Sequence, residues 1–320
     1  MVRTFAAIDV GSFELEMGIY EISEKTGVRS IDHVKHMIAL GKDTFEDGKI
    51  SYQMVEETCR VLKDFASIMK GYQVNEYRAY ATTAMREAKN SQIVLEQIRV
   101  RTGIQVKVLS NSEQRFIRYK AIAIKASEFQ KTIQKGTAIA DVGFGSMQAS
   151  VFDKDSLIST QNLPLGVLKL RQILTHAKLS AQAEQSLVME LIDNELLTFR
   201  KMYLKDREIK HLIAIGDPIL TMYYKLNGIT RSDRLTAEKF NSFFEWMRTK
   251  TRAQLEDAFD VNGEYASMMF PTVAIYKRML EVTGAEILWV PGIRMADGTA
   301  AEYAEEKNLS VDMASVEDGS

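Results

Sequence analysis

Two short segments of the chain share residue types that can bind phosphate. Residues 7–12 read AIDVGS and residues 138–146 read AIADVGFGS, and their aspartates lie 132 positions apart. In both, an apolar run typical of a strand ends in a glycine turn. An anion can come close to the backbone N–H groups of such a turn, because glycine has no side chain. A single copy would suit any hairpin, whereas two copies favour a phosphate site built from two similar halves.

Alternating strands and helices must position these segments. We expect strands on both sides of the first turn, a strand over 33–40, a turn-rich loop over 40–51 and an amphipathic helix over 52–70. The second half repeats the plan from a strand over 137–142 onwards. Such alternation predicts an α/β fold with helical crossovers between strands.

Two α/β halves that each open with a strand, Asp-Val-Gly and a returning strand resemble the actin-like ATPase superfamily. This resemblance implies two ribonuclease H-like domains, at 1–125 and 126–303, with a ligand cleft between them and a helical insertion in the second. Residues 304–320 are polar and acidic, and we expect them to fray.

Composition excludes several classes of protein. The chain has 41 basic and 43 acidic side chains and a net charge of −2, which predicts no general attraction to nucleic acid or to an anionic membrane. With one cysteine, Cys59, and four histidines, neither an intrachain disulfide nor a Cys/His zinc cluster is expected. No apolar run approaches a membrane span, so we expect a soluble cytoplasmic protein.

Six motifs, in order over about residues 4–300, resemble the exopolyphosphatase/guanosine pentaphosphate phosphatase family. They are AIDVGS at 7–12, ALGKDTFEDGKIS at 39–51, YATTAMREAKN at 80–90, VLSNSEQ at 108–114, ADVGFGS at 140–146 and LPLGVLKL at 163–170. The resemblance implies release of terminal phosphate from polyphosphate or guanosine pentaphosphate by water, with Mg or Mn. It corresponds to the short, two-domain form of the family and allows a homodimer.

The resemblance also assigns a set of phosphate-binding positions. A guanidinium offers a fork of donors that matches phosphate oxygens, and Arg86 occupies the arginine position of the family's ATSALREA-like motif. Its alternative role is a surface ion pair with Glu87. Thr82 and Thr83 offer hydroxyl groups beside it. The complete set of expected phosphate-binding residues is Asp9, Gly11, Ser12, Arg86, Asp141, Gly143, Gly145 and Ser146.

The catalytic positions depart from the family pattern. Both family acids are replaced by amides, at Gln114 and Gln148. An amide cannot accept a proton from water near neutral pH, and a general base contributes ~10²–10⁴ in rate. Glu113 remains, but Ser110 and Glu113 have the spacing of a capping box, which favours a role at a helix start over catalysis.

Glu14 is a third departure, because it stands where the family has a polar, uncharged residue. A carboxylate facing a phosphate at about 4 Å would cost ~4 kcal/mol at an effective dielectric near 20. Glu14 therefore points elsewhere, or it holds a metal ion or a water as a relocated base, with Glu16 on the same strand face.

Three functions remain open at this point. The first is a metal-assisted phosphoanhydride hydrolase with a relocated carboxylate. The second is a regulatory protein that binds polyphosphate or guanosine penta- or tetraphosphate without cleaving it, which the two glutamines favour. A sugar or acetate kinase of the same superfamily fits the motif order least well.

Overall fold

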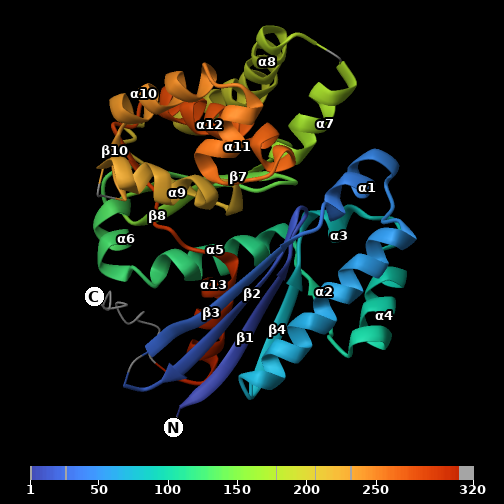
Figure 1. Ribbon diagram of the computed structural model, residues 1–320. Helices are drawn as coiled ribbons and strands as arrows, with labels where there is room; N and C mark the ends of the chain where they lie inside the picture. Colours follow the sequence, from blue (N-terminus) through green and yellow to red (C-terminus); the bar gives the residue numbers. More distant parts are fainter. Residues whose placement is uncertain (1, 26, 178, 206, 231–232, 310–320) are drawn as a thin grey trace. The chain divides into compact units, whose positions relative to one another are not determined.

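The computed structural model describes residues 2–25, 27–177, 179–205, 207–230 and 233–309. The chain divides into two compact units, shown in Figure 1: the first comprises Met1–Ala126 and Arg294–Ser320, and the second Ser127–Ile293. Both are α/β units with a mixed sheet, so the predicted fold class is confirmed.

The first unit contains a five-stranded sheet in the order β3-β2-β1-β4-β5. Its elements are β1 (Arg3–Val10), β2 (Glu14–Ser23), β3 (Gly27–Met37), α1 (Leu40–Asp47), α2 (Tyr52–Gly71), β4 (Glu76–Ala81), α3 (Thr83–Glu87), α4 (Ser91–Thr102), β5 (Val106–Val108), α5 (Asn111–Ala123) and α13 (Met295–Glu306), and α6 (Ala126–Ile133) begins at its boundary. In Figure 1, α2 and α4 cover one face of this sheet, and α5 and α13 the other.

The core of the first unit follows from the alternation along β1 and β2. Ile8 and Leu15 belong to the cluster with α2 and α4. Phe5 and Tyr20 belong to a second cluster on the opposite face, with the small residues of α13. Two histidines that the sequence spacing predicts on opposite faces of β3 also separate this way, since His33 approaches Glu16 and His36 packs against the Phe65 ring of α2.

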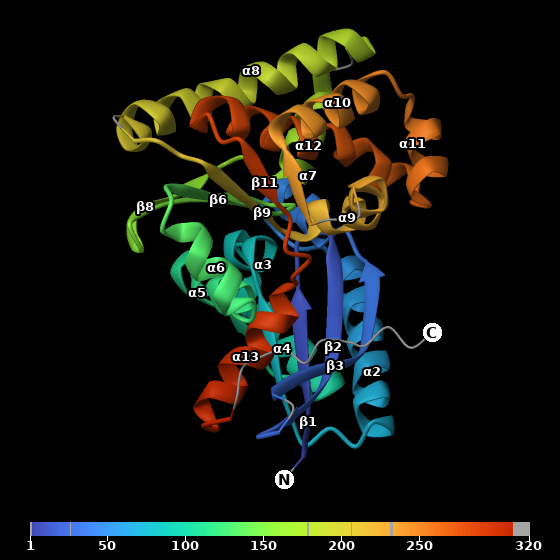
Figure 2. The same ribbon diagram turned by 90° about the vertical axis from the view of Figure 1, so that its left-hand side faces the viewer.

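The second unit contains a six-stranded sheet in the order β10-β11-β9-β6-β7-β8. Its elements are β6 (Thr137–Val142), β7 (Met147–Asp153), β8 (Ser156–Leu163), α7 (Val167–Ala177), α8 (Ala181–Phe199), the π-helix η1 (Arg200–Leu204), β9 (His211–Ile215), α9 (Asp217–Thr230), β10 (Arg234–Thr236), α10 (Ala237–Arg248), α11 (Arg252–Phe259), α12 (Gly263–Thr283) and β11 (Ile287–Trp289). Figure 2 shows α12 among α7, α8 and α10, and α12 packs against β6 and β9.

The end of the chain differs from the predicted domain assignment. The sequence placed residues up to 303 in the second half, but α13 belongs to the first unit, where Ala300 and Tyr303 pack against Phe5. The predicted frayed tail begins inside this helix, because α13 continues to Glu306, and residues 310–320 lie outside the described part of the chain.

The loop predicted over 40–51 is another difference. Residues Leu40–Asp47 form α1, which ends at Gly48 in a left-handed conformation with φ of 71°. The Gly41 N–H donates to the Ser12 carbonyl at 2.6 Å, so this helix holds the first glycine turn. A segment rich in turn residues becomes helical here because tertiary contacts override its local preference.

Candidate functional site

The first turn joins β1 to β2. The Gly11 N–H donates to the Glu14 carbonyl at 3.0 Å, and a Cβ on Gly11 would lie 2.8 Å from that oxygen. The Ser12 hydroxyl accepts a hydrogen bond from the Ala84 N–H at 3.2 Å. The turn is therefore tied to the start of α3, the helix that carries Arg86.

Arg86 and Gln114 are brought together from α3 and α5. One terminal nitrogen of Arg86, Nη1, donates to the Leu109 carbonyl at 2.7 Å and to Gln114 Oε1 at 3.3 Å. The other, Nη2, donates to the Thr83 hydroxyl at 3.1 Å. Burial lowers the pKa of the half-buried guanidinium. The amide at the first family acid position thus orients the arginine.

Arg86 has no carboxylate partner for an ion pair among the described residues, and the three groups that hold it are neutral. The surface pair with Glu87 that the sequence left open is not formed, although the charge of Glu87 raises the arginine pKa slightly against the burial effect. A cation held this way in a partly desolvated place favours an anionic ligand.

Glu113 occupies the predicted capping box at the start of α5. It accepts from the Ser110 N–H at 2.8 Å, while the Ser110 hydroxyl accepts from the Glu113 N–H at 3.2 Å. Lys107 Nζ lies 2.7 Å from its other oxygen. Chiefly through that lysine, the pKa of Glu113 falls to about 2. Such a carboxylate is a weak proton acceptor, so Glu113 caps a helix and is a poor general base.

Three further carboxylates of the first unit lie on one face of its sheet. Asp9 lies directly opposite Glu16 in the β1–β2 register, and both side chains are buried. Glu14 is 3% exposed and lies 2.9 Å from Lys35 Nζ. Glu16 Oε2 lies 3.4 Å from His33 Nε2. The charge of Glu14 is therefore compensated by a lysine of β3, which explains how a buried carboxylate can lie so near the turn.

The second turn joins β6 to β7 and is held by α7. The Gly143 N–H donates to the Ser146 carbonyl at 2.9 Å. The Val167 N–H donates to the Gly143 carbonyl at 3.2 Å, and the Leu168 N–H to the Phe144 carbonyl at 2.9 Å. Because a trans peptide points its C=O and N–H in opposite directions, the next two N–H groups point away from α7. Consecutive amides arranged this way form an anion-binding concavity.

Two glycines allow the chain to pack closely behind this turn. A Cβ on Gly166, in the LPLG motif, would lie 2.2 Å from the Gly145 carbonyl carbon. A Cβ on Gly216, after β9, would lie 2.1 Å from the Val142 oxygen, and its φ is +119°. No other residue type fits at either position without moving the backbone.

The second turn carries an amide where the first carries an acid. Asp141 lies directly opposite Gln148 in the β6–β7 register, and both are buried. The Phe144 ring packs edge-on against Tyr265 at 5.9 Å and is buried, so this side chain points into the core and not into the turn.

The family resemblance implies Mg or Mn at the site. In the described part of the chain, no group of three or more His, Cys, Asp or Glu side chains is arranged to hold a metal ion. A magnesium ion that acts on a phosphate chain is usually held by one or two carboxylates, and the phosphate oxygens and water supply its other ligands. Among the described residues, no helix combines the length and apolar composition needed to cross a membrane.

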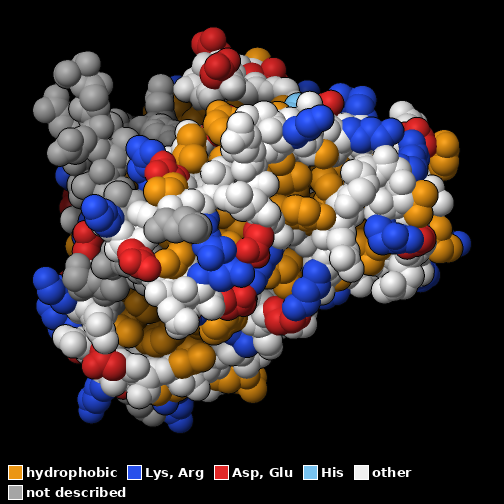
Figure 3. Space-filling model, turned by 90° about the horizontal axis from the view of Figure 1, so that it is seen from below, with side chains coloured by type: hydrophobic (Ala, Val, Ile, Leu, Met, Phe, Trp, Pro, Cys, Tyr) orange, Lys and Arg blue, Asp and Glu red, His pale blue; other side chains and the backbone are white. Residues whose placement is uncertain are grey.

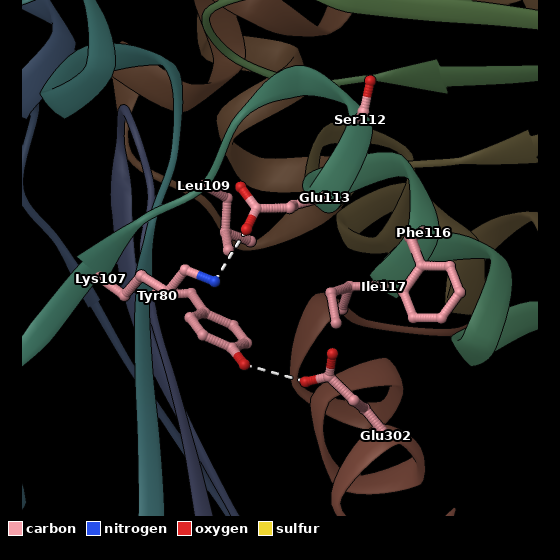
Figure 4. A pocket seen from close by; sticks show the side chains of 8 residues that line it. All are labelled: Tyr80, Lys107, Leu109, Ser112, Glu113, Phe116, Ile117 and Glu302. Carbon is pink, nitrogen blue, oxygen red and sulfur yellow. Dashed lines mark hydrogen bonds and ion pairs between the residues drawn. The ribbon is translucent and has the colours of Figure 1, made fainter.

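Sequence reasoning missed two features of the first unit. The first is Arg118, which lies one turn beyond Gln114 on α5 and is only 3% exposed. The spacing of apolar residues along a helix does not reveal a buried arginine. The second feature is a cavity of about 250 Å³ beside Glu113, shown in Figure 4. It is lined by Tyr80, Lys107, Leu109, Ser112, Glu113, Phe116, Ile117 and Glu302.

Comparison with known proteins identifies the family. The Ppx/GppA phosphatase family matches residues 19–290. This chain belongs to that family. Exopolyphosphatase 1 of Mycobacterium tuberculosis is 24% identical over 163 residues, 51% of this chain and 46% of that protein. The guanosine-5′-triphosphate,3′-diphosphate pyrophosphatase of Photobacterium profundum is 25% identical over 159 residues, 48% of this chain and 31% of that protein. The match thus spans less than half the length of these relatives.

Solved structures of Ppx/GppA proteins share the fold over almost the whole chain. The Aquifex aeolicus family member superposes with a TM-score of 0.76 at 20% identity, covering 97% of this chain and 100% of that one. An exopolyphosphatase from Cytophaga hutchinsonii gives 0.81 at 16% identity, with the same coverage. At these identities the likeness establishes the two-domain fold.

Proposed function

We propose that this Ppx/GppA protein binds the phosphate chain of polyphosphate or of guanosine penta- or tetraphosphate, with little or no cleavage. The observation that carries the proposal is Arg86, a half-buried cation held by neutral acceptors alone. In the same unit, the glycine turn at Gly11–Ser12 is tied to α3 through the Ser12 hydroxyl and supplies further phosphate contacts. The turn at Gly143–Ser146 is a separate candidate phosphate site of the second unit. Asp9 and Asp141 mark the ends of the strands that present these turns.

Weak cleavage follows from the two amides. Gln114 is engaged by Arg86, and Gln148 lies opposite Asp141, so neither position supplies a group that can take a proton from water. Without a positioned base, the bound phosphate chain is held by donors that stabilise its charge but attacking water is not activated.

A second candidate function is slow hydrolysis with Glu16 as the base. It is favoured over Glu14 and Glu113 because those two carboxylates are each held by a lysine. Glu16 is buried opposite Asp9, and its Oε2 atom lies 3.4 Å from His33 Nε2 and, among the described residues, not beside a lysine.

Calorimetry with inorganic tripolyphosphate tests the binding proposal. Arg86→Ala should weaken binding by about 10–100-fold, because hydrogen bonds to charged groups are worth about 1.5–3 kcal/mol. Arg99→Ala is the matched control, since Arg99 is an exposed arginine of α4 paired with Glu96. Equal affinities for the wild type and Arg86→Ala would contradict the proposal.

Phosphate release with Mg or Mn, measured on the same samples, separates the two candidates. Binding without release is the expected result. Slow phosphate release that disappears in Glu16→Gln would instead establish the hydrolase.

A further inference from the structure

Each sheet ends in an antiparallel edge strand, and the two edge strands correspond in the repeated fold. β3 is the third strand of the first unit and β8 the third strand of the second, and each pairs with the strand that precedes it. Each also contains a bulge, because the register skips Ile31 in β3 and Ile158 in β8. These two side chains are 42% and 41% exposed. The two edges can therefore be compared residue by residue.

The edge strand of the first unit carries charged side chains. β3 contains Arg29, Asp32 and Lys35 among its eleven residues. Arg29 pairs with Glu21, and Lys35 pairs with Glu14. Proteins use charged residues on an exposed edge to prevent further strands from adding to a sheet. An added strand would remove these groups of β3 from water, so this edge resists pairing.

The edge strand of the second unit lacks this protection. β8 reads SLISTQNL, with no charged residue, no proline and no glycine. In the shared register, Asn162 of β8 corresponds to Lys35 of β3, and Ser159 corresponds to Asp32. Neutral polar side chains thus occupy the positions that are charged in the first unit. Leu157, 46% exposed, and Ile158 add apolar surface to this edge.

The outer side of β8 also presents backbone groups that can pair. β8 is the last strand of its sheet, and Figure 2 shows it at one side of that sheet. Within the described ranges, its backbone ladder is made with β7, and no further backbone hydrogen bond reaches Ser156–Leu163. Because alternate residues of a strand direct their N–H and C=O groups to opposite sides, half of these groups point away from β7. Such a row of groups is a template for another strand.

A second copy of β8 suits this edge. Antiparallel pairing around a two-fold axis places the same patch on both partners. Since β8 is uncharged along its length, no register of this pairing brings like charges together. Its central hydroxyl and amide side chains, from Ser159 to Asn162, can form hydrogen bonds across a strand pair. An interface built on two strands of eight residues is smaller than a standard one, so the expected dimer is reversible.

We propose that β8 pairs antiparallel with β8 of a second copy of this chain, which joins the two six-stranded sheets across a two-fold axis. The edge at β3 takes no part. The inference does not depend on the proposed phosphate binding, because it rests on an edge strand and not on the glycine turns.

Sedimentation over a series of protein concentrations tests the proposal. The wild type should be a reversible dimer. Asn162→Lys gives β8 the lysine that β3 has, at an exposed position, and should raise the dissociation constant by about 10-fold or more because each dimer gains two lysines at the paired edge. Gln105→Lys, at an exposed position of the first unit, is the matched control and should leave the dissociation constant unchanged.

Cysteine cross-linking locates the interface. The native Cys59 is buried, so an introduced cysteine reports on its own surroundings. Opposed Cα atoms of antiparallel strands lie about 4.5–5.5 Å apart, a separation that a disulfide can span. Of Ser159→Cys, Thr160→Cys and Gln161→Cys, tested singly, at least one should form a disulfide-linked dimer on oxidation. Ile31→Cys, at the bulge of the other edge, should stay unlinked.

Three results would overturn the inference. The first is a wild type that stays monomeric at every concentration. The second is a dimer whose dissociation constant is the same in the wild type and in Asn162→Lys. The third is a dimer in which none of the three cysteines of β8 forms a disulfide, since the contact would then lie elsewhere on the protein.

Discussion

The two glycine turns have the same frame and different charges. In the first unit Asp9 faces Glu16 across a strand pair, and in the second Asp141 faces Gln148, and the partners are seven positions apart in both. The two strands that run parallel beside them also correspond, since β4 pairs with β1 and β9 with β6. The repeated fold therefore preserves backbone geometry, while each unit has its own side-chain chemistry.

The residues that follow Asp-Val-Gly make the same point. Glu14 in the first unit corresponds by its spacing from the aspartate to Ser146 in the second, and the acid is tolerated because Lys35 lies beside it. Behind the turn of the second unit, the glycines at 166 and 216 pack against its backbone. The difference teaches that two copies of one backbone frame can carry different charged groups beside the turn. On the face seen in Figure 3, basic and acidic side chains are interspersed and not gathered by sign.

Replacing both glutamines by glutamate should have the largest effect on phosphate release. The double variant Gln114→Glu with Gln148→Glu should raise phosphate release by ~10²–10⁴, because each new carboxylate can accept a proton from water. The measurement is release from tripolyphosphate with Mg or Mn, with Gln105→Glu as a control for added charge. No gain in the double variant would show that the sites differ by more than these two groups.

Gly216→Ala tests the close backbone packing behind the second turn. The corresponding position after β4 in the first unit is Thr82, whereas Gly216 has a φ of +119° and backbone within 2.1 Å of the added Cβ. We expect a loss of about 3 kcal/mol or more in the free energy of unfolding, from strain and overpacking together.

Urea denaturation measures this loss, and Gly143→Ala is the matched control. Its added Cβ would meet only the Ser146 oxygen at 3.2 Å, so its loss should be much smaller. Similar losses in the two variants would contradict the packing argument.

Lys35→Met tests the charge compensation at the first turn. It leaves the Glu14 carboxylate, 3% exposed, without its lysine, and we expect a loss of about 1–3 kcal/mol in the free energy of unfolding. In the double variant Lys35→Met with Glu14→Gln, most of that loss should be recovered. A double-mutant cycle by denaturation measures the coupling, and additive losses would show that the pair contributes nothing.

Glu113→Gln should have the smallest effect. The variant loses part of a capping box, at a cost of about 1 kcal/mol near neutral pH. The folded pKa of Glu113 is about 2, below its ordinary value of 4.5, so this stabilisation is present above pH 4.5 and disappears as the pH falls toward 2.

Stability measured from pH 7 to pH 2 should therefore show the wild type and Glu113→Gln converging at the acid end. Binding of tripolyphosphate should stay unchanged in the variant at pH 7. A large loss of tripolyphosphate binding at pH 7 would show that Glu113 takes part in phosphate binding.

The sequence by itself determined the repeated α/β plan, the two glycine turns, the capping box at Ser110 and Glu113, and membership of the family. These features depend on local patterns: alternation along strands, glycine at turns and residue spacing at a helix start. The amide character of Gln114 and Gln148 was equally visible, because residue identity alone limits which groups can accept a proton.

Only the tertiary structure decided where α13 belongs, that residues 40–47 form a helix, and which partners hold Arg86 and Glu14. These outcomes depend on contacts between segments far apart in the chain, such as Lys35 with Glu14 and Tyr303 with Phe5. The same holds for the cavity between Tyr80 and Glu302, whose residues lie 222 positions apart. Local sequence patterns do not reveal such contacts. The contacts stabilise the protein only when the folded chain brings the two residues together and excludes water from them.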